Sequence, residues 1–247
     1  RNMAQTVIRP LPPIDEVDGA RLIQHVDAIA ADDRESGTPG EWEAARYVIA
    51  SLKQYGVDVR LETVRTITSR PLGASLRLDP DLELPCITQA YSGSVEALTA
   101  PLVSVEDALS ASGDLTGRIV LAPGLASPSA CRVLTDRGAA GMIFINHGDY
   151  PHNMAISSVW GMPTRVQIAQ LDYPPVVSVS HPVGERIRAH LSNDPAATAT
   201  LSTEVDTGLR DLPLIVADIA AAGRTTDRFA LLNGHLDSWH RGAIDNA

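Results

Sequence analysis

The sequence predicts an α/β protein in which a mixed sheet is covered by helices and interrupted by an inserted β-rich module. Three observations support this fold class. Two helix-like segments open the chain, buried β-α-β segments occupy its middle, and apolar strand-like runs return near its end. With 247 residues, 44% of them hydrophobic, the chain is long enough to bury a core and to form two domains.

The opening of the chain predicts two helices and a strand. Apolar residues recur at the spacing of one helix face over residues 17–31. The breakers of the stretch ADDRESGTPGE follow, and a second helical pattern covers residues 42–52 before Gly56. Apolar and polar residues then alternate over residues 57–61, as in a half-buried strand.

The composition of the sequence changes near Pro71. From there the chain is rich in Pro, Gly and Ser and contains short runs in which apolar and polar residues alternate. We therefore expect an inserted domain over residues 71–206, enclosed by a second domain made of residues 1–70 and 207–247. The expected strands of the insert are residues 117–122, 141–146, 174–180 and 197–204, and its expected helices are residues 129–139 and 182–191.

The last part of the chain carries the residues most suited to chemistry. Apolar runs at residues 213–220 and 228–235 predict two strands of a covered sheet. The second run would present His235 and Asp237 at its C-terminal end, with Asp245 in the loop beyond, and open α/β sheets place their sites at that edge.

The spacing of these three residues suits a metal site. An imidazole at His235 and a carboxylate at Asp245 are donors that zinc accepts, and the small residues Gly234, Gly242 and Ala243 let the backbone turn tightly. Asp237 points to the same side of an extended chain as His235 and could accept its other ring N–H. On pattern alone, a polar turn at a strand end is the alternative, with His240 and Arg241 as solvated neighbours.

Composition argues against several classes of protein. Twenty Lys and Arg stand against 30 Asp and Glu, and a net charge of −10 argues against nucleic acid or an anionic membrane as a partner. No apolar run is long enough to span a membrane. The only cysteines, Cys86 and Cys131, are too few for a disulfide scaffold or a cysteine metal site, so we expect two small buried residues.

The first residues lack the apolar stretch of a secretory signal. If the native chain starts at Met3, we expect a cytoplasmic protein. A secreted protein whose signal has been removed would have the same sequence.

The run GHLDSWHRGAIDNA at the end of the chain resembles the first metal motif of M28 zinc peptidases. Its HxDSW pattern is especially similar to the glutamate carboxypeptidase II and transferrin receptor branch. The stretch ADDRESGTPGEWEAARYVIASLKQYGVDV resembles the opening of these enzymes, and LTGRIVLAPG with RGAAGMIFIN is similar to a protease-associated (PA) domain. The resemblance implies the zinc-exopeptidase fold, with the PA domain as the insert.

The resemblance also implies roles for the three motif residues. His235 would be a terminal ligand of one zinc ion, Asp237 the carboxylate that orients it, and Asp245 the carboxylate that bridges two zinc ions. In the family, a Glu-Glu pair farther along the chain supplies the general base and a ligand, and an Asp and a His complete the sites. The sequence holds no counterpart of these, so we expect it to be a segment of a longer protein.

The implied function is hydrolysis of peptide or small amide substrates by a metal-activated water. We expect an aminopeptidase, and a carboxypeptidase or another amidohydrolase of the same fold is the alternative. A non-catalytic binding protein on the same scaffold is the alternative, although retention of all three motif residues argues against it. A homodimer is compatible with both the enzyme and the binding protein.

The loop over residues 147–167 is the expected source of substrate contacts, because its side chains could stack on a substrate or clamp a carboxylate. The candidate residues are His152, Asn153, Trp160 and Arg165. The alternative is a structured loop in which Trp160 packs on its own module.

Overall fold

A computed structural model describes residues 18–111, 113–159, 161–220 and 226–243. The chain divides into two compact units. Unit 1 consists of residues 1–63 and 212–247, and unit 2 of residues 64–211. An internal stretch thus forms one unit between two outer stretches, with boundaries that differ by a few residues from those expected at residues 71 and 206.

Two helices, α1 (Gly19–Ile29) and α2 (Pro39–Gln54), form the helical part of unit 1, as the sequence predicts. The side chain of Asp18 caps α1 by accepting hydrogen bonds from the backbone N–H groups of its first turn. His25 of α1 joins the two helices, because its ring nitrogens lie 2.8 Å from the hydroxyl of Tyr47 and 3.0 Å from that of Tyr55.

Two long neighbouring strands, β1 (Asp58–Leu78) and β8 (Thr198–Asp218), begin in one unit and end in the other. The strand predicted at residues 57–61 is therefore the start of a longer one, and the two strands predicted at residues 197–204 and 213–220 are one. Both strands contain a proline where the described residues pair on one flank at most: β2 pairs with β1 from residue 76, and β4 pairs with β8 up to residue 203. A missing N–H is tolerated on an unpaired flank, and both strands continue through Pro71 and Pro213.

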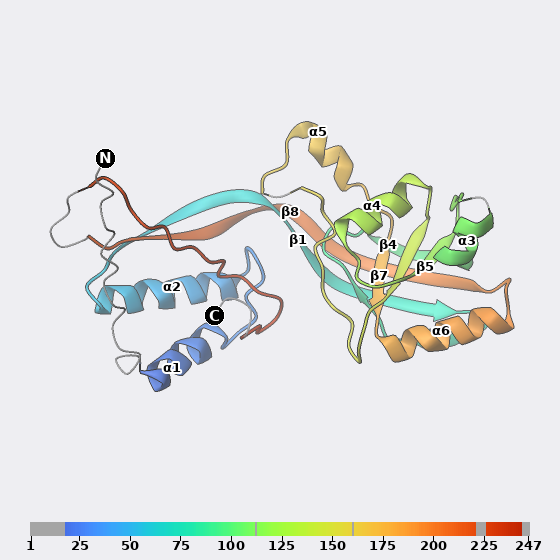
Figure 1. The fold of residues 1–247 in the computed structure, drawn as a ribbon, viewed down its shortest axis with the longest axis horizontal. Helices are drawn as coiled ribbons and strands as arrows, with labels where there is room; N and C mark the ends of the chain where they lie inside the picture. Colours follow the sequence, from blue (N-terminus) through green and yellow to red (C-terminus); the bar gives the residue numbers. More distant parts are fainter. Residues whose placement is uncertain (1–17, 112, 160, 221–225, 244–247) are drawn as a thin grey trace, which may run out of the picture. The chain divides into compact units, whose positions relative to one another are not determined.

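The mixed sheet has the strand order β2-β1-β8-β4-β5-β6-β7-β3, in which β4 to β7 are parallel (Figure 1). Its shorter strands are β2 (Leu82–Leu84), β3 (Ile87–Thr88), β4 (Val95–Ser104), β5 (Ile119–Pro123), β6 (Gly141–Ile145) and β7 (Val176–Val179). The helices of unit 2 are α3 (Val105–Ala111), α4 (Pro128–Asp136), α5 (Arg165–Ile168), the 3-10 turn η2 (Ala169–Leu171) and α6 (His181–Asn193).

The core of unit 2 lies on both faces of this sheet. Along β5, Ile119 and Leu121 belong to a cluster that α6 covers, whereas Val120 and Ala122 belong to a cluster on the other face with residues of α4 (Figure 1). A strand buried on both faces has a continuous run of apolar residues in its sequence, and for this reason the sequence predicts these strands well. The predicted α/β class with a mixed sheet covered by helices is confirmed.

The two cysteines are free thiols in unit 2, and Cys131 is fully buried in the α4 cluster. Burial raises the pKa of Cys131 to about 12 and that of the half-buried Cys86 to about 11. Cys131 thus behaves as a small core residue, as expected.

The strand predicted at residues 228–235 is not formed: residues 226–243 contain neither helix nor strand. Phe229, Leu231 and Leu232 are 85%, 76% and 94% exposed. An apolar run becomes a strand only when a neighbouring strand takes up its backbone hydrogen bonds, and none of the described strands lies beside this one. Among the described residues, no helix combines the length and apolar character that crossing a bilayer requires.

Candidate metal site

His235 and Asp237 lie together in unit 1, on an irregular segment of residues 234–243 that we call the His235 loop. The Nδ1 atom of His235 is 2.8 Å from the backbone oxygen of Asp237 and 3.1 Å from its Oδ1. The side chains are 49% and 34% exposed, so both reach the surface of the loop. The pair predicted from the HxD spacing therefore forms without the strand on which the prediction placed it.

The contacts of His235 fix which ring nitrogen carries the proton. A backbone carbonyl oxygen can only accept a hydrogen bond, so the Nδ1 atom beside the Asp237 carbonyl must donate. In the neutral imidazole, Nε2 then carries the lone pair. This is the tautomer that a metal ligand needs, with the carboxylate behind it.

The Asp237 carboxylate has a second donor from another part of unit 1. The hydroxyl of Ser36 donates to Oδ2, while Nδ1 of His235 lies beside Oδ1. Oδ2 thus has its own donor, and Oδ1 shares the Nδ1–H of His235 with the Asp237 carbonyl, which together restrict rotation of the carboxylate. Ser36 belongs to the turn of residues 33–38 that precedes α2, which we call the Arg34 turn.

Arg34 joins this turn to the His235 loop and is completely buried. Its Nε donates to the carbonyl of Leu236 at 2.9 Å and its Nη2 to the carbonyl of Gly242 at 2.7 Å. The backbone of Arg34 donates to the carbonyl of His240 and accepts from the N–H of Ser238. Residues 236, 238, 240 and 242 of the loop are therefore each hydrogen-bonded to Arg34 through their backbone atoms.

Glu41, in the first turn of α2, is a buried carboxyl close to this arrangement, only 4% exposed. The backbone N–H of Gly37 donates to its Oε2 at 2.6 Å. Burial raises the pKa of Glu41 to about 7, and the negative charge of Asp237 adds to the rise, whereas the hydrogen bond from Gly37 opposes it. The first turn of α2, bonded to Gly37 of the Arg34 turn, thus carries a carboxyl group that changes charge near neutral pH.

We expect Glu41→Gln to make the metal-free protein less sensitive to pH. Because the folded protein holds the Glu41 proton up to about pH 7 and the unfolded chain loses it near 4.5, wild-type stability falls between these values. The variant keeps an acceptor for Gly37 but has no charge to bury. Its advantage in unfolding free energy should be near zero at pH 4.5 and reach at most about 3 kcal/mol above pH 7. Denaturant unfolding at several pH values measures this, and a constant difference from pH 5 to 8 would contradict it.

Whether the other predicted site residues join His235 stays a prediction. Asp245 and Trp160 lie outside the described residues. His152 and Arg165, both exposed, and the half-buried Asn153 belong to unit 2, where they stay a prediction. Within the described ranges, no group of three or more His, Cys, Asp or Glu side chains is arranged to hold a metal.

Sequence reasoning missed Arg34, Ser36 and Glu41 as parts of the site. The stretch ADDRESGTPGE predicted the end of a helix through its breakers, and it resembles the opening of M28 enzymes. The spacing of its charged residues did not indicate a contact with a loop about 200 residues away. The available signal was an arginine and a glutamate among Gly, Ser and Pro residues, a composition that also fits an exposed turn.

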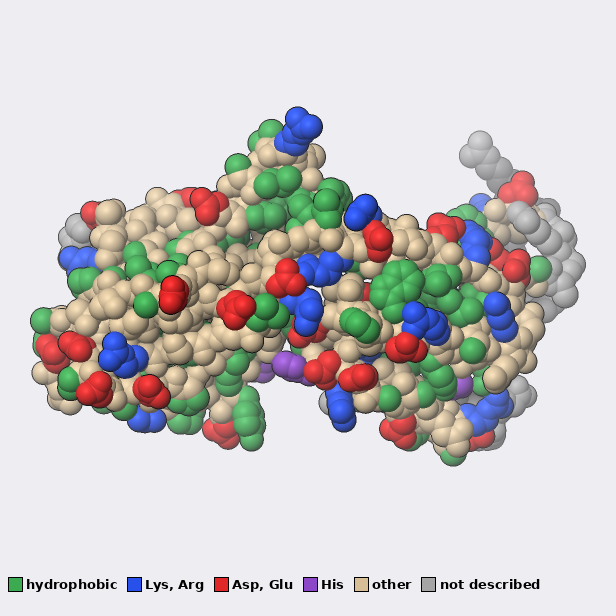
Figure 2. All heavy atoms as spheres, turned by 180° about the vertical axis from the view of Figure 1, so that it is seen from behind, with side chains coloured by type: hydrophobic (Ala, Val, Ile, Leu, Met, Phe, Trp, Pro, Cys, Tyr) green, Lys and Arg blue, Asp and Glu red, His purple; other side chains and the backbone are tan. Residues whose placement is uncertain are grey.

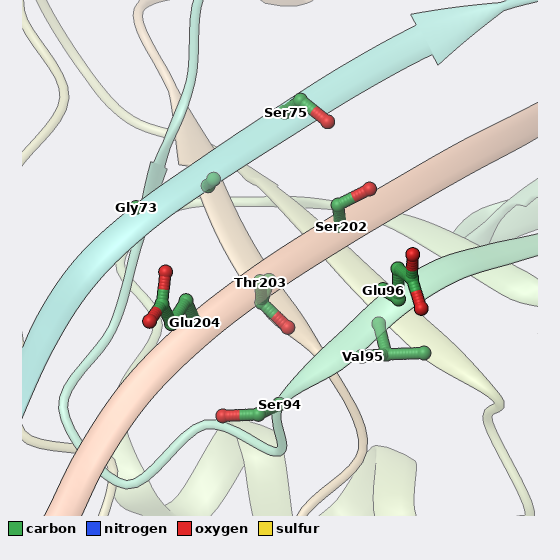
Figure 3. A pocket seen from close by; sticks show the side chains of 9 residues that line it. Gly73, Ser75, Ser94, Val95, Glu96, Ser202, Thr203 and Glu204 are labelled. Atoms are coloured by element: carbon green, nitrogen blue, oxygen red, sulfur yellow. The ribbon is translucent and has the colours of Figure 1, made fainter.

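Unit 2 contains an open groove of about 560 Å³ on β1, β4 and β8. Figure 3 shows the carboxylates of Glu96 and Glu204 on either side of Thr203, with the hydroxyls of Ser75 and Ser202 nearby. The groove carries two carboxylates on a largely apolar lining, and neither His235 nor Asp237 lines it.

Comparisons with known proteins place the fold among the M28 peptidases. The aminopeptidase of Aneurinibacillus sp. strain AM-1 matches with a TM-score of 0.64 and 19% identity, over 85% of this chain and 50% of that one. A Peptidase M28 precursor from Shewanella amazonensis matches with a TM-score of 0.71 and 21% identity, over 90% and 56%. BSAP, a zinc aminopeptidase from Bacillus subtilis, matches with a TM-score of 0.63 and 19% identity, over 88% and 50%.

The chain spans about half the length of these solved structures. No protein-family profile and no curated protein sequence matches it. The likeness is therefore one of fold, and the fold is that of M28-type peptidases.

Proposed function

We propose that this chain contributes the N-terminal part of a zinc-dependent M28-type exopeptidase that hydrolyses peptide or small amide bonds. The observation that carries the proposal is the His235–Asp237 pair, in which a carboxylate accepts from Nδ1 and leaves the lone pair on Nε2. The fold likeness to zinc aminopeptidases supports the same reading.

The donor chemistry of the His235 loop fits a zinc ion. A half-exposed imidazole with a fixed tautomer is a common zinc ligand, and Arg34 and Ser36 hold it and its carboxylate in place. By the resemblance, His235 would hold one of two zinc ions and Asp245 would bridge both. Zinc supplies Lewis acidity, which polarises a scissile carbonyl and lowers the pKa of water.

We further propose that unit 2 is the PA-like insert and contributes substrate contacts. Its segments GRIVLA and GMIFIN form the adjacent buried strands β5 and β6. Hydrophobic side chains gather on the projecting segment around α5, where Met162, Val166 and Ile168 are exposed (Figure 2). Beside them, the exposed Arg165 would suit a substrate carboxylate and His152 or Asn153 a polar group. The HLDSW run supports the glutamate carboxypeptidase II and transferrin receptor branch in particular.

We expect Asp237→Ala to lower zinc affinity and turnover by roughly 10- to 100-fold, because the imidazole of His235 loses the carboxylate that orients it. The measurements are zinc binding by chelator competition and hydrolysis of an unblocked aminoacyl p-nitroanilide by the full-length protein. Chelation should abolish turnover, and added zinc should restore it.

The matched control is Asp218→Ala, which removes an exposed aspartate of unit 1 that pairs with Arg60 at the surface. It should bind zinc and turn over substrate as the wild type does. Faster cleavage of an N-blocked peptide than of the unblocked anilide would favour carboxypeptidase action instead. Full turnover after complete removal of metal would contradict the proposed function.

A further inference from the structure

The His235 loop has no regular secondary structure, yet it holds the histidine and the carboxylate in a defined relation. Something other than a sheet must therefore fix its shape. Besides hydrogen bonds within the loop, described contacts that do so come from the Arg34 turn. We propose that Arg34 and Ser36 are positioning residues, which set the orientation of His235 and Asp237 toward a metal ion; this inference rests on the proposed function.

The first argument is the pattern of bonds to Arg34. Its side chain donates to the carbonyls of Leu236 and Gly242, and its backbone bonds Ser238 and His240. These contacts bracket Asp237 on both sides. All of them go to backbone atoms, so they fix the course of the loop whatever side chains it carries.

The second argument is the burial of the Arg34 charge. A completely buried guanidinium is costly unless its donors are satisfied, and the acceptors it reaches among the described residues are carbonyl oxygens. Its Nη1 has no hydrogen-bond partner within the described part of the chain. An apolar side chain would stabilise a simple core contact at lower cost, which favours a role in shaping the loop over a role in stability alone.

The third argument is the contact of Ser36 with the carboxylate itself. Its hydroxyl donates to Oδ2 of Asp237, the oxygen that His235 does not use. Without that donor, the carboxylate can rotate away from the imidazole. Arg34 thus positions the backbone of the loop, and Ser36 positions the side chain that orients the histidine.

The test compares Arg34→Lys, Ser36→Ala and Ser36→Thr in the full-length protein. Lysine keeps the charge but has one nitrogen and cannot bond two carbonyls in the geometry of a guanidinium. Zinc affinity should fall about 10- to 100-fold in Arg34→Lys and about tenfold in Ser36→Ala. Ser36→Thr, which keeps the hydroxyl, should restore most of the affinity.

Amide hydrogen exchange of the metal-free protein supplies a readout that needs no zinc. In Arg34→Lys, the amides of the His235 loop should exchange faster while those of α2 keep their protection. A merely structural role would lower protection throughout unit 1 and leave the zinc affinity of the folded fraction unchanged. If Arg34→Lys does not fold, the pair Ser36→Ala and Ser36→Thr still decides the matter.

Arg60→Lys and Ser51→Ala are the matched controls. Arg60 is an exposed arginine of unit 1 that pairs with Glu62 and Asp218, and Ser51 lies in the second half of α2. Both variants should bind zinc as the wild type does. Wild-type affinity in Arg34→Lys and Ser36→Ala would overturn the positioning role alone, whereas a wild-type protein that takes up no zinc would overturn the proposed function and this inference with it.

Discussion

Replacing Asp245 by alanine is expected to abolish both zinc binding at full stoichiometry and turnover. In the proposed function, Asp245 would be the carboxylate shared by two zinc ions, so its loss would remove one donor from each. A zinc ion with catalytic function keeps few protein ligands, and the loss of one is seldom compensated. His235 and its Asp237 partner would remain, but a single oriented imidazole does not retain a metal.

The measurements for this variant are zinc content of the dialysed full-length protein and hydrolysis of an unblocked aminoacyl p-nitroanilide. Asp58→Ala is the matched control, because Asp58 is an exposed aspartate at the start of β1 in the same unit. It should keep the zinc and the activity of the wild type. Near-wild-type turnover in Asp245→Ala would refute the bridging role.

Gly40→Ala is expected to cause the largest loss of stability in unit 1. A Cβ at this position would lie 1.8 Å from the carbonyl oxygen of Asp33 and 2.9 Å from its carbonyl carbon. Both are backbone atoms, so no side-chain rotation relieves the overlap, and the Arg34 turn or the start of α2 must move. We expect a cost of about 3 kcal/mol, which corresponds to a fall in melting temperature of about 10 °C.

The same displacement should reach the metal site, because Asp33 is the neighbour of Arg34. Zinc affinity of the folded Gly40→Ala protein should therefore fall together with its stability. The control is Gly19→Ala, since Gly19 also lies in the first turn of a helix but has open space where a Cβ would be. That variant should be as stable as the wild type or slightly more stable. An unchanged melting temperature in Gly40→Ala would show that the turn and the helix are farther apart than described.

Much of the fold could be predicted from local pattern. Helices α1 and α2 follow from their 3.6-residue periodicity, and β5 and β6 from short apolar runs buried on both faces. The long strands β1 and β8 were predicted as shorter pieces, because the clear alternation of β1 stops early and the pattern of β8 changes after Asp206. How far a strand continues depends on the strands that pair with it, which is a property of the sheet and not of the local sequence.

The site could be predicted only in part, for a similar reason. The HxD spacing predicts the His235–Asp237 contact because both residues belong to one short segment. The predicted strand beneath them depended on a neighbour that the described residues do not contain. Arg34 and Ser36 act across about 200 residues of sequence, and a single sequence carries no signal for that pairing.

The most direct test is a crystal structure of the full-length protein grown with zinc, with anomalous diffraction recorded on both sides of the zinc absorption edge. We predict an anomalous peak at ligand distance from Nε2 of His235, with Asp237 still accepting from Nδ1 and Asp245 beside the metal. Zinc-loaded crystals with no peak at His235, or with His235 bonded through Nδ1, would contradict the metal site on which the proposed function depends.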